Sequence, residues 1–267
     1  MCTSFVFYSD KTYIGMNFDI SDRPITLSLK KHSQLIISQK DGPNFYPSFG
    51  LNEEGVFMNM LLVAPTEAGA YRRCKNCIHS GRLLEEVLSG RINPDSLEAL
   101  FHEKTIVSVP AASVHSMVVG KNHSVCVVEP GRSIIPMKLS DKGFLVLTNF
   151  PLTDFVNRDY TEVVGDGAGR YKTCYRMLQE SREAFSLERG FVTLEATAQN
   201  DGDFPTQFSM LAVPEEACVY FALKRGFHKR FKFSFLDHII RTDEGFAHPQ
   251  TLSIDRKSTL LSELAEW

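Results

Sequence analysis

The sequence predicts an α+β fold in which two mostly antiparallel β-sheets carry helices on their outer faces. Three observations lead to this prediction. Strand-like segments come in runs, helices come in pairs between those runs, and the chain shows no strand–helix–strand repeat of the kind that builds parallel sheets. The chain has 267 residues with neither a clear linker nor an internal repeat, so we expect one domain over residues 1–267.

The first third of the chain has the pattern of strands joined by turns. Apolar runs at 3–9 and 12–20 flank Asp10 and Lys11, a pair that suits a tight hairpin turn. Further strand-like segments lie at 25–29, 34–38 and 55–63. Later segments with the same character lie at 114–120, 124–128, 144–148, 208–213, 219–223 and 231–235.

Two pairs of helices interrupt the strands. Apolar residues at helical spacing predict a helix over 79–88, and Pro94 opens a second helix with Leu97 facing inward. The second pair is expected at 171–185 and 187–199, and a terminal helix at 258–267.

Composition excludes several classes of function. Hydrophobic residues make up 43% of the chain and the net charge is -3, so the broad cationic surface that nucleic acid requires is not expected. No apolar run approaches the roughly 18 residues of a membrane helix. The first residues do not resemble a signal peptide, and the six cysteines are dispersed, so we expect reduced thiols in the cytoplasm.

Two other motifs have structural interpretations. Cys74 and Cys77, with His79 nearby, have the spacing of metal ligands, but a structural zinc site usually needs a second ligand pair. We therefore expect an incidental pair, no metal and no cofactor. The glycine-rich run 165–169 is interpreted as a loop presenting Arg170 rather than as a phosphate site.

Cys2 carries the main chemical signal. Aminopeptidases generally remove a methionine that precedes a small residue, which would leave Cys2 with a thiol and a free α-amine. Their ordinary pKa values, about 8.5 and about 7.7–8.0, make proton transfer between them nearly thermoneutral. Asp19 ends the second strand of the predicted hairpin, where its carboxylate is expected to return to Cys2 and hold the protonated amine.

The residues around these positions resemble the choloylglycine hydrolase family, which includes bile salt hydrolases and penicillin V acylases. The matching segments, in order, are Met-Cys-Thr-Ser at 1–4, Gly-Met-Asn-Phe-Asp at 15–19, Gly-Leu-Asn-Glu-Glu-Gly at 50–55, Leu-Thr-Asn-Phe-Pro at 147–151 and Thr-Gln-Phe-Ser at 206–209. The resemblance implies a four-layer αββα sandwich, the N-terminal-nucleophile (Ntn) hydrolase fold. It implies Cys2 as nucleophile, Asp19 orienting its amine, Asn149 donating to the oxyanion, and Arg170 near the nucleophile.

Two positions depart from the family pattern. Met16 stands where bile salt hydrolases carry an arginine, and Leu62 stands where an asparagine usually helps to form the oxyanion hole. Asn59 is close in sequence, but an offset of three reverses the face of a strand, so the oxyanion role is not transferred to it. Met16, Leu62 and Asn59 are therefore candidate substrate-binding positions, and a backbone N–H is expected as the second oxyanion donor.

We expect a cytoplasmic cysteine hydrolase of linear, non-peptide amide C–N bonds, acting on a small molecule through an acyl-enzyme. Two alternatives stay open. One is an acyltransferase on the same fold, and the other is a degenerate member that binds ligands without catalysis. The resemblance also suggests a homotetramer or a homodimer.

Overall fold

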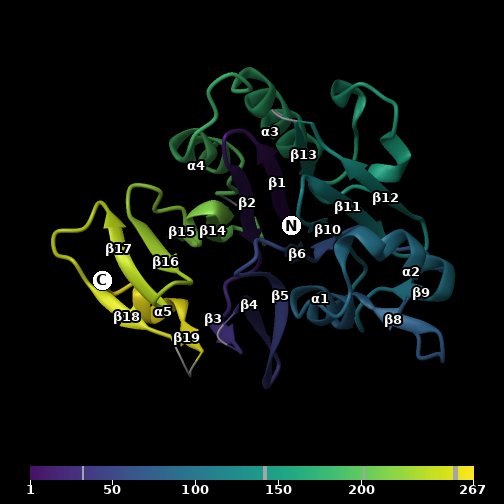
Figure 1. Cartoon of the computed structure of the whole chain (residues 1–267), viewed down its shortest axis with the longest axis horizontal. Helices are drawn as coiled ribbons and strands as arrows, with labels where there is room; N and C mark the ends of the chain where they lie inside the picture. The colour runs from purple at the N-terminus through teal and green to yellow at the C-terminus, as the bar shows by residue number, and fades with distance from the viewer. Residues whose placement is uncertain (32, 141–142, 201, 255–257) are drawn as a thin grey trace.

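The computed structural model describes residues 1–31, 33–140, 143–200, 202–254 and 258–267, which form two large sheets stacked between helices (Figure 1). The first sheet contains, in order across it, β13 (Phe144–Leu147), β1 (Cys2–Tyr8), β2 (Thr12–Asp19), β14 (Thr206–Val213), β15 (Cys218–Leu223), β16 (Arg230–Ser234), β17 (Ile239–Glu244) and β18 (Thr251–Ser253). The second contains β12 (Ser133–Lys138), β11 (Ser124–Glu129), β10 (Val114–Val119), β6 (Phe57–Asn59), β5 (Asn44–Asn52), β4 (Gln34–Asp41), β3 (Ile25–Lys30) and β19 (Thr259–Leu260). The short strand β7 (Leu61–Leu62) also belongs to it and pairs with β10.

The helices cover the outer faces of the two sheets. Helices α3 (Ala168–Glu180) and α4 (Leu187–Ala196) pack against β1, β2, β13 and β14 of the first sheet. Helix α1 (Ser80–Leu88) packs against β5, β6 and β10 of the second. The smaller elements are β7 (Leu61–Leu62), β8 (Cys77–His79), β9 (Thr105–Val107), α2 (Leu97–Glu103), α5 (Leu261–Leu264), and 3-10 turns at Pro94–Ser96, Leu152–Phe155, Tyr160–Glu162 and Pro214–Glu216.

This architecture confirms the predicted α+β sandwich of two mainly antiparallel sheets. Within the described residues every ladder of the two large sheets is antiparallel, and β8 pairs with β9 in parallel. Aromatic rings fill the space between the sheets: the Phe49 ring lies 5.2 Å from the Phe18 ring and 6.0 Å from the Phe208 ring. Strands β1 and β2 are buried on both faces, which explains their nearly continuous apolar sequences.

The expected terminal helix at 258–267 is wrong for most of its length. Thr259 and Leu260 instead form β19, with Thr259 opposite Leu27 of β3, and helix α5 has four residues. A strand edge was available for pairing at this point, and tertiary pairing overrides local helix propensity. The strand expected at 55–63 is divided at Met60, whose N–H donates to the Ser48 carbonyl at 2.9 Å.

Two of the strands that the sequence did not predict contain proline. Pro136 lies in β12 at the edge of the second sheet, where a missing N–H donor is tolerated. Pro47 lies in β5 beside a register shift in the pairing with β4. Proline therefore marks an edge and an irregularity here, and it does not end the strands.

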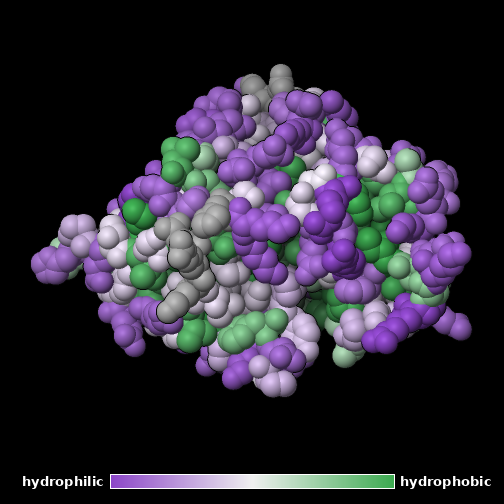
Figure 2. Space-filling view, turned by 60° about the horizontal axis from the view of Figure 1, so that its bottom comes forward, coloured by the Kyte–Doolittle hydropathy of each residue, from purple (hydrophilic) through white to green (hydrophobic). Residues whose placement is uncertain are grey.

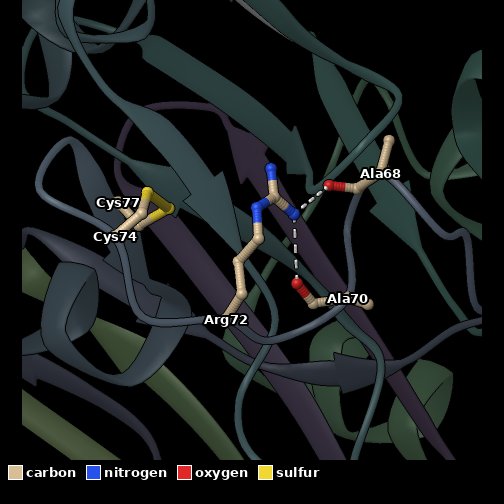
Figure 3. Close-up of a disulfide and its surroundings, with 5 residues drawn as sticks. All are labelled: Ala68, Ala70, Arg72, Cys74 and Cys77. Carbon is tan, nitrogen blue, oxygen red and sulfur yellow. Dashed lines mark hydrogen bonds between the residues drawn. A yellow bond between two sulfur atoms is a disulfide. The ribbon is translucent and has the colours of Figure 1, made fainter.

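Cys74 and Cys77 form a disulfide, which corrects the expectation of an incidental pair of reduced thiols (Figure 3). The Cys77 N–H donates to the Cys74 carbonyl at 3.2 Å, and this turn brings the two Cα atoms to 5.1 Å. In the same loop Arg72 donates to the carbonyl oxygens of Ala68 and Ala70. The free cysteines of the described residues are all buried: Cys2, Cys126, Cys174 and Cys218.

The surface, the helices and the potential metal ligands bear on the expectations from the sequence. Hydrophilic side chains predominate on the face in Figure 2, with hydrophobic ones scattered between them. Among the helices of the described ranges, none combines the length and the apolar character needed to cross a membrane. The described residues also contain no cluster of three or more His, Cys, Asp or Glu side chains placed to hold a metal ion.

Gly15 leaves the space that the Phe5 ring of β1 occupies over β2. A Cβ at this position would lie 2.3 Å from two ring atoms of Phe5, a ring buried against Phe185. We expect Gly15→Ala to lower the free energy of unfolding by about 1–3 kcal/mol, since the core must shift to admit the methyl group. Urea unfolding measures this change in the free energy of unfolding. Gly169→Ala, where nothing lies within 4 Å, is the control and should not destabilise the protein; an equal loss in both variants would contradict this explanation.

Candidate active site

Four neighbouring strands end at one edge of the first sheet, and the predicted catalytic residues lie there. Across the sheet these strands are β13, β1, β2 and β14. Because they are antiparallel, the end of β13, the start of β1, the end of β2 and the start of β14 share one edge. Asn149, Cys2, Asp19 and Thr206 stand at these four ends.

Cys2 begins β1 with its side chain on the face toward the second sheet. In the hairpin Cys2 lies opposite Phe18 and Ser4 lies opposite Met16. These residues share one face, and their contacts identify it: the Ser4 hydroxyl lies 3.9 Å from the Met117 sulfur of the second sheet, and the Phe18 ring packs on Phe49. Cys2 is 4% exposed. The nucleophile candidate is therefore buried at the end of the space between the sheets.

Asp19 faces the opposite side of the first sheet, toward the helical layer. Its carboxylate accepts hydrogen bonds from the Thr206 hydroxyl at 2.6 Å and the Gln199 amide at 3.1 Å, and lies 3.5 Å from the Arg170 guanidinium. The Met1 amino group donates to the Asp19 carbonyl oxygen. With Met1 in place the backbone carbonyl of Asp19, and not its carboxylate, receives the amino group, so the role expected for the carboxylate stays a prediction.

Burial controls the charge of Asp19. Desolvation raises the pKa of its carboxyl to about 6 from an ordinary value of 3.8, against the opposing effects of the Thr206 hydroxyl and the Arg170 guanidinium. A carboxyl whose pKa is raised on folding favours folding below its unfolded-state pKa. That contribution is lost as the pH rises through about 6, so ionised Asp19 depends on its cationic and hydrogen-bonding partners.

Arg170 connects the residues at this edge. It lies in the first turn of α3, and one guanidinium nitrogen donates to the Cys2 carbonyl at 2.5 Å and to the Thr3 hydroxyl at 2.8 Å. The other nitrogen donates to the Asn149 side-chain oxygen at 2.8 Å. Gly167, the residue before the helix, has φ of 77°, and a Cβ there would lie 2.8 Å from the guanidinium. Glycine at this position therefore allows both the turn and the close approach of the arginine.

Asn149 is held in one orientation by three hydrogen bonds. Its side-chain oxygen accepts from the Cys2 N–H at 2.8 Å and from Arg170, and its side-chain nitrogen donates to the Leu62 carbonyl at 2.7 Å. Two donors fix the oxygen, so the NH₂ group must face Leu62. The second hydrogen of that NH₂ group is available to another acceptor.

Leu62 turns its backbone toward Asn149. In the β7–β10 pairing Leu62 lies opposite Val114, and the next residue, Val63, donates to Ser113. Hydrogen-bonded pairs alternate in an antiparallel ladder, so the N–H and carbonyl of Leu62 point away from β10. Both groups therefore point to the side on which Asn149 lies.

The three candidate substrate-binding residues have different environments. Met16 and Asn59 are fully buried and contact each other across the sheets, with the Asn59 side-chain nitrogen 3.9 Å from the Met16 sulfur. The Asn59 side-chain oxygen also accepts the Met117 N–H at 2.8 Å. The Leu62 side chain is 43% exposed. Their role in binding a substrate stays a prediction.

Sequence reasoning missed three residues that hold the site together. Thr206 lies in a segment that the resemblance had marked, but no role was assigned to its hydroxyl. Thr3 lies next to Cys2, and its hydroxyl accepts a hydrogen bond from Arg170. Gln199 lies between α4 and β14, and we find no sequence signal that could have identified it.

The Cys2 thiol is protonated while Met1 is present. Burial raises its pKa to about 11, an effect reinforced by the negative charge of Asp19 and opposed by the nearby amino group and Arg170. The thiolate, not the thiol, is the reactive form. With Met1 in place the Cys2 thiol is therefore in its less reactive form.

Comparison with known proteins supports the fold. No protein-family model matches the sequence, and no curated protein matches it. Among solved structures, a variant of conjugated bile acid hydrolase from Clostridium perfringens is similar with a TM-score of 0.61 and 15% identity, covering 94% of this chain and 97% of that one. Penicillin V acylase from Agrobacterium tumefaciens gives a TM-score of 0.66 and 11% identity, covering 92% and 93%. The chain therefore shares their overall fold along nearly its whole length.

Removal of the Arg170 guanidinium should destabilise this edge of the sheet. We expect Arg170→Met to lower the free energy of unfolding by about 3 kcal/mol, because the variant leaves the Asp19 carboxylate without its buried cationic partner. Arg176→Met is the matched control, since Arg176 lies on the same helix in an exposed pair with Glu180 and should cost less than about 1 kcal/mol. Urea unfolding of both variants is the measurement, and equal losses would contradict the central role of Arg170.

Proposed function

We propose that this chain is a member of the choloylglycine hydrolase family, a cysteine amidase that hydrolyses linear amide C–N bonds with Cys2 as nucleophile. The observation that carries the proposal is the 2.8 Å hydrogen bond from the Cys2 nitrogen to the Asn149 side-chain oxygen, with Arg170 bound to the same oxygen. It brings the atom that becomes the α-amine, the thiol beside it and the predicted oxyanion donor into one place. The shared fold of the two solved structures supports this proposal.

Loss of Met1 is the activating step. The Cys2 nitrogen then changes from an amide to an amine, and its hydrogen bond to Asn149 holds this amine beside the Cys2 thiol. The amine takes the thiol proton, and the thiolate attacks the substrate carbonyl carbon. The protonated amine then gives that proton to the leaving nitrogen, which departs as an amine and leaves a thioester on Cys2. Water attacks the thioester, so the acid is released and the thiol is restored.

Asn149 and Leu62 are suited to stabilise the oxyanion. The Leu62 N–H points to the same side of β7 as the Leu62 carbonyl that binds the Asn149 NH₂ group, and the Asn149 oxygen binds the Cys2 nitrogen. Two fixed donors are what a tetrahedral intermediate needs, and losing one such donor typically costs about 10²–10³ in kcat. A backbone N–H can donate to the oxyanion whatever side chain the residue carries, so a leucine is compatible with this position.

Arg170 and Asp19 orient the reacting groups. Arg170 binds the Asn149 oxygen and so keeps the NH₂ group turned to the oxyanion. The Asp19 carboxylate, beside the Arg170 guanidinium, balances the positive charge that this arginine and the Cys2 amine bring to a buried site. In this assignment Met16 and the Leu62 side chain contact the acyl group, and Asn59 lies behind Met16.

The substrate is proposed to be a small-molecule amide. The two neighbours are named as a conjugated bile acid hydrolase and a penicillin V acylase, and both names denote small-molecule substrates. A homotetramer or homodimer and a cytoplasmic location stay predictions. The Cys74–Cys77 disulfide argues against that compartment, because disulfides persist mainly in oxidising environments.

Cys2→Ala should abolish acylation. We expect loss of the acyl-enzyme seen by intact mass when the protein is mixed with an activated amide or ester such as a nitrophenyl acyl derivative, because the attacking sulfur is gone. Cys126→Ala, which removes another buried free thiol on the far side of the second sheet, should acylate as the wild type does. Acylation of Cys2→Ala at the wild-type rate would refute the assignment of the nucleophile. Added amine acceptors in the same assay distinguish hydrolysis from acyl transfer.

Met1 should suppress the reactivity of the thiol. With the thiol pKa at about 11, roughly one Cys2 side chain in 1,000 is thiolate at pH 8 in the Met1-bearing protein. We therefore expect iodoacetamide to alkylate Cys2 far more slowly in protein made with methionine aminopeptidase inhibited than in protein whose mass shows that Met1 is gone. Peptide mapping measures the two rates, and denatured samples give the exposed-thiol reference. Equal rates in the two folded proteins would be inconsistent with activation by Met1 removal.

A further inference from the structure

A histidine and a glutamate lie buried together behind Asn149. His115 and Glu129 are 0% and 1% exposed, and the His115 Nδ1 atom lies 2.9 Å from a Glu129 carboxylate oxygen. The other ring nitrogen, Nε2, lies 2.6 Å from the carbonyl oxygen of Thr148, the residue before Asn149. Neither residue takes part in the proposed reaction.

The pair comes from the second sheet, whereas Asn149 follows a strand of the first. Strands β10 and β11 pair with Ser116 opposite Val128, so the same register brings His115 opposite Glu129 on one face. That is also the face of Met117, which contacts Ser4 of the first sheet. The bond from His115 to Thr148 therefore joins the second sheet to the end of β13.

Glu129 binds the chain on the other side of Asn149. One carboxylate oxygen accepts the Leu152 N–H at 2.7 Å, and the other accepts the Thr153 N–H at 3.1 Å and the Thr153 hydroxyl at 2.6 Å. His115 holds residue 148 and Glu129 holds residues 152 and 153. The two side chains thus form a clamp on the short segment that presents Asn149.

Both nitrogens of the His115 ring face acceptors. Nε2 must carry hydrogen to donate to the Thr148 carbonyl, and Nδ1 faces a carboxylate, so one proton lies between Nδ1 and Glu129. The hydrogen bonds from His115, Thr153 and Leu152 keep the pKa of the Glu129 carboxyl below its ordinary value although burial opposes this. The pair therefore shares one proton and is neutral overall, and each of its polar atoms has a hydrogen-bond partner.

We propose that His115 and Glu129 are positioning residues for Asn149, which clamp residues 148–153 so that the Asn149 NH₂ group stays directed at the oxyanion. This inference rests on the proposed function. A buried ion pair contributes little net stability compared with a well-packed apolar pair, whereas its hydrogen bonds fix direction. The clamp and the Leu62 carbonyl hold Asn149 from the second sheet, while Cys2 and Arg170 hold it from the first.

The test compares His115→Gln and Glu129→Gln with two controls. In His115→Gln the shorter amide side chain cannot donate to Thr148 and to Glu129 at once, and Glu129→Gln removes the charge that holds His115 and the three donors of Leu152 and Thr153. Ser116→Ala changes a buried neighbour on the opposite face of β10, and Val87→Ala destabilises the core between α1 and the second sheet, remote from Asn149. Val87→Ala therefore supplies a loss of stability without a change in the clamp.

Two readouts separate positioning from general stability. We expect hydrogen exchange at the Leu152 and Thr153 amides to accelerate by about tenfold or more in both clamp variants and to stay unchanged in both controls. We expect kcat for amide hydrolysis to fall about 10–100-fold in the clamp variants with KM changed by less than about threefold, because the substrate still binds while the oxyanion donor is misplaced.

Each readout can fail on its own. Unchanged exchange at residues 152 and 153 in the clamp variants would overturn the clamp. Accelerated exchange with wild-type kcat would overturn its role in positioning Asn149, as would a loss of kcat in Val87→Ala equal to that in His115→Gln. A wild-type protein that hydrolyses no amide, yet shows slow exchange that the clamp variants lose, would contradict the proposed function and leave the clamp in place.

Discussion

The hydrogen bond from the Cys2 nitrogen to the Asn149 side chain is the interaction on which the rest of the site depends. It joins residues 147 positions apart in the sequence, which become neighbours because β13 lies beside β1 in the first sheet. The same edge brings Asp19 and Thr206 into reach from β2 and β14. Arg170 then binds groups from β1 and from the end of β13, so the antiparallel strand order alone assembles most of the polar site.

Burial sets the electrostatics of this edge. It raises the pKa of both the Asp19 carboxyl and the Cys2 thiol, and each charged form is stable only beside a partner of opposite sign. Arg170 and the amino group at the start of the chain are the available cations. Removing Met1 moves that amino group to the Cys2 nitrogen, next to the thiol. In the proposed mechanism this one event supplies the base and changes the charge balance of the site.

The sequence predicted the components of the fold better than their contacts. The hairpin of β1 and β2 followed from apolar runs and a turn signal, and it correctly placed Asp19 near Cys2. The Asp19 carboxylate faces the helical layer because side chains alternate between the two faces of β2, and Gln199 binds it there. No local sequence pattern identifies Gln199 as a partner. Asn149 and Arg170 were identified through family resemblance, because side chains so distant in sequence meet only after the sheet has formed. The Cys74–Cys77 disulfide depends on a local turn, and the pairing of Thr259 with β3 depends on a free strand edge. The hydrophobic periodicity of the sequence predicts neither feature.

The site is built from both sheets, and this explains how Met16 and Leu62 are compatible with the proposed catalytic arrangement. Cys2, Arg170 and Asp19 belong to the first sheet and its helical cover, whereas Leu62, His115 and Glu129 belong to the second. Asn149 is the point at which the two sets meet. Its direction is fixed by backbone and side-chain groups on both sides, so an apolar Met16 can take the place of a charged residue and join the packing between the sheets. In the proposed mechanism the placement of one sheet against the other is therefore itself part of the catalytic geometry.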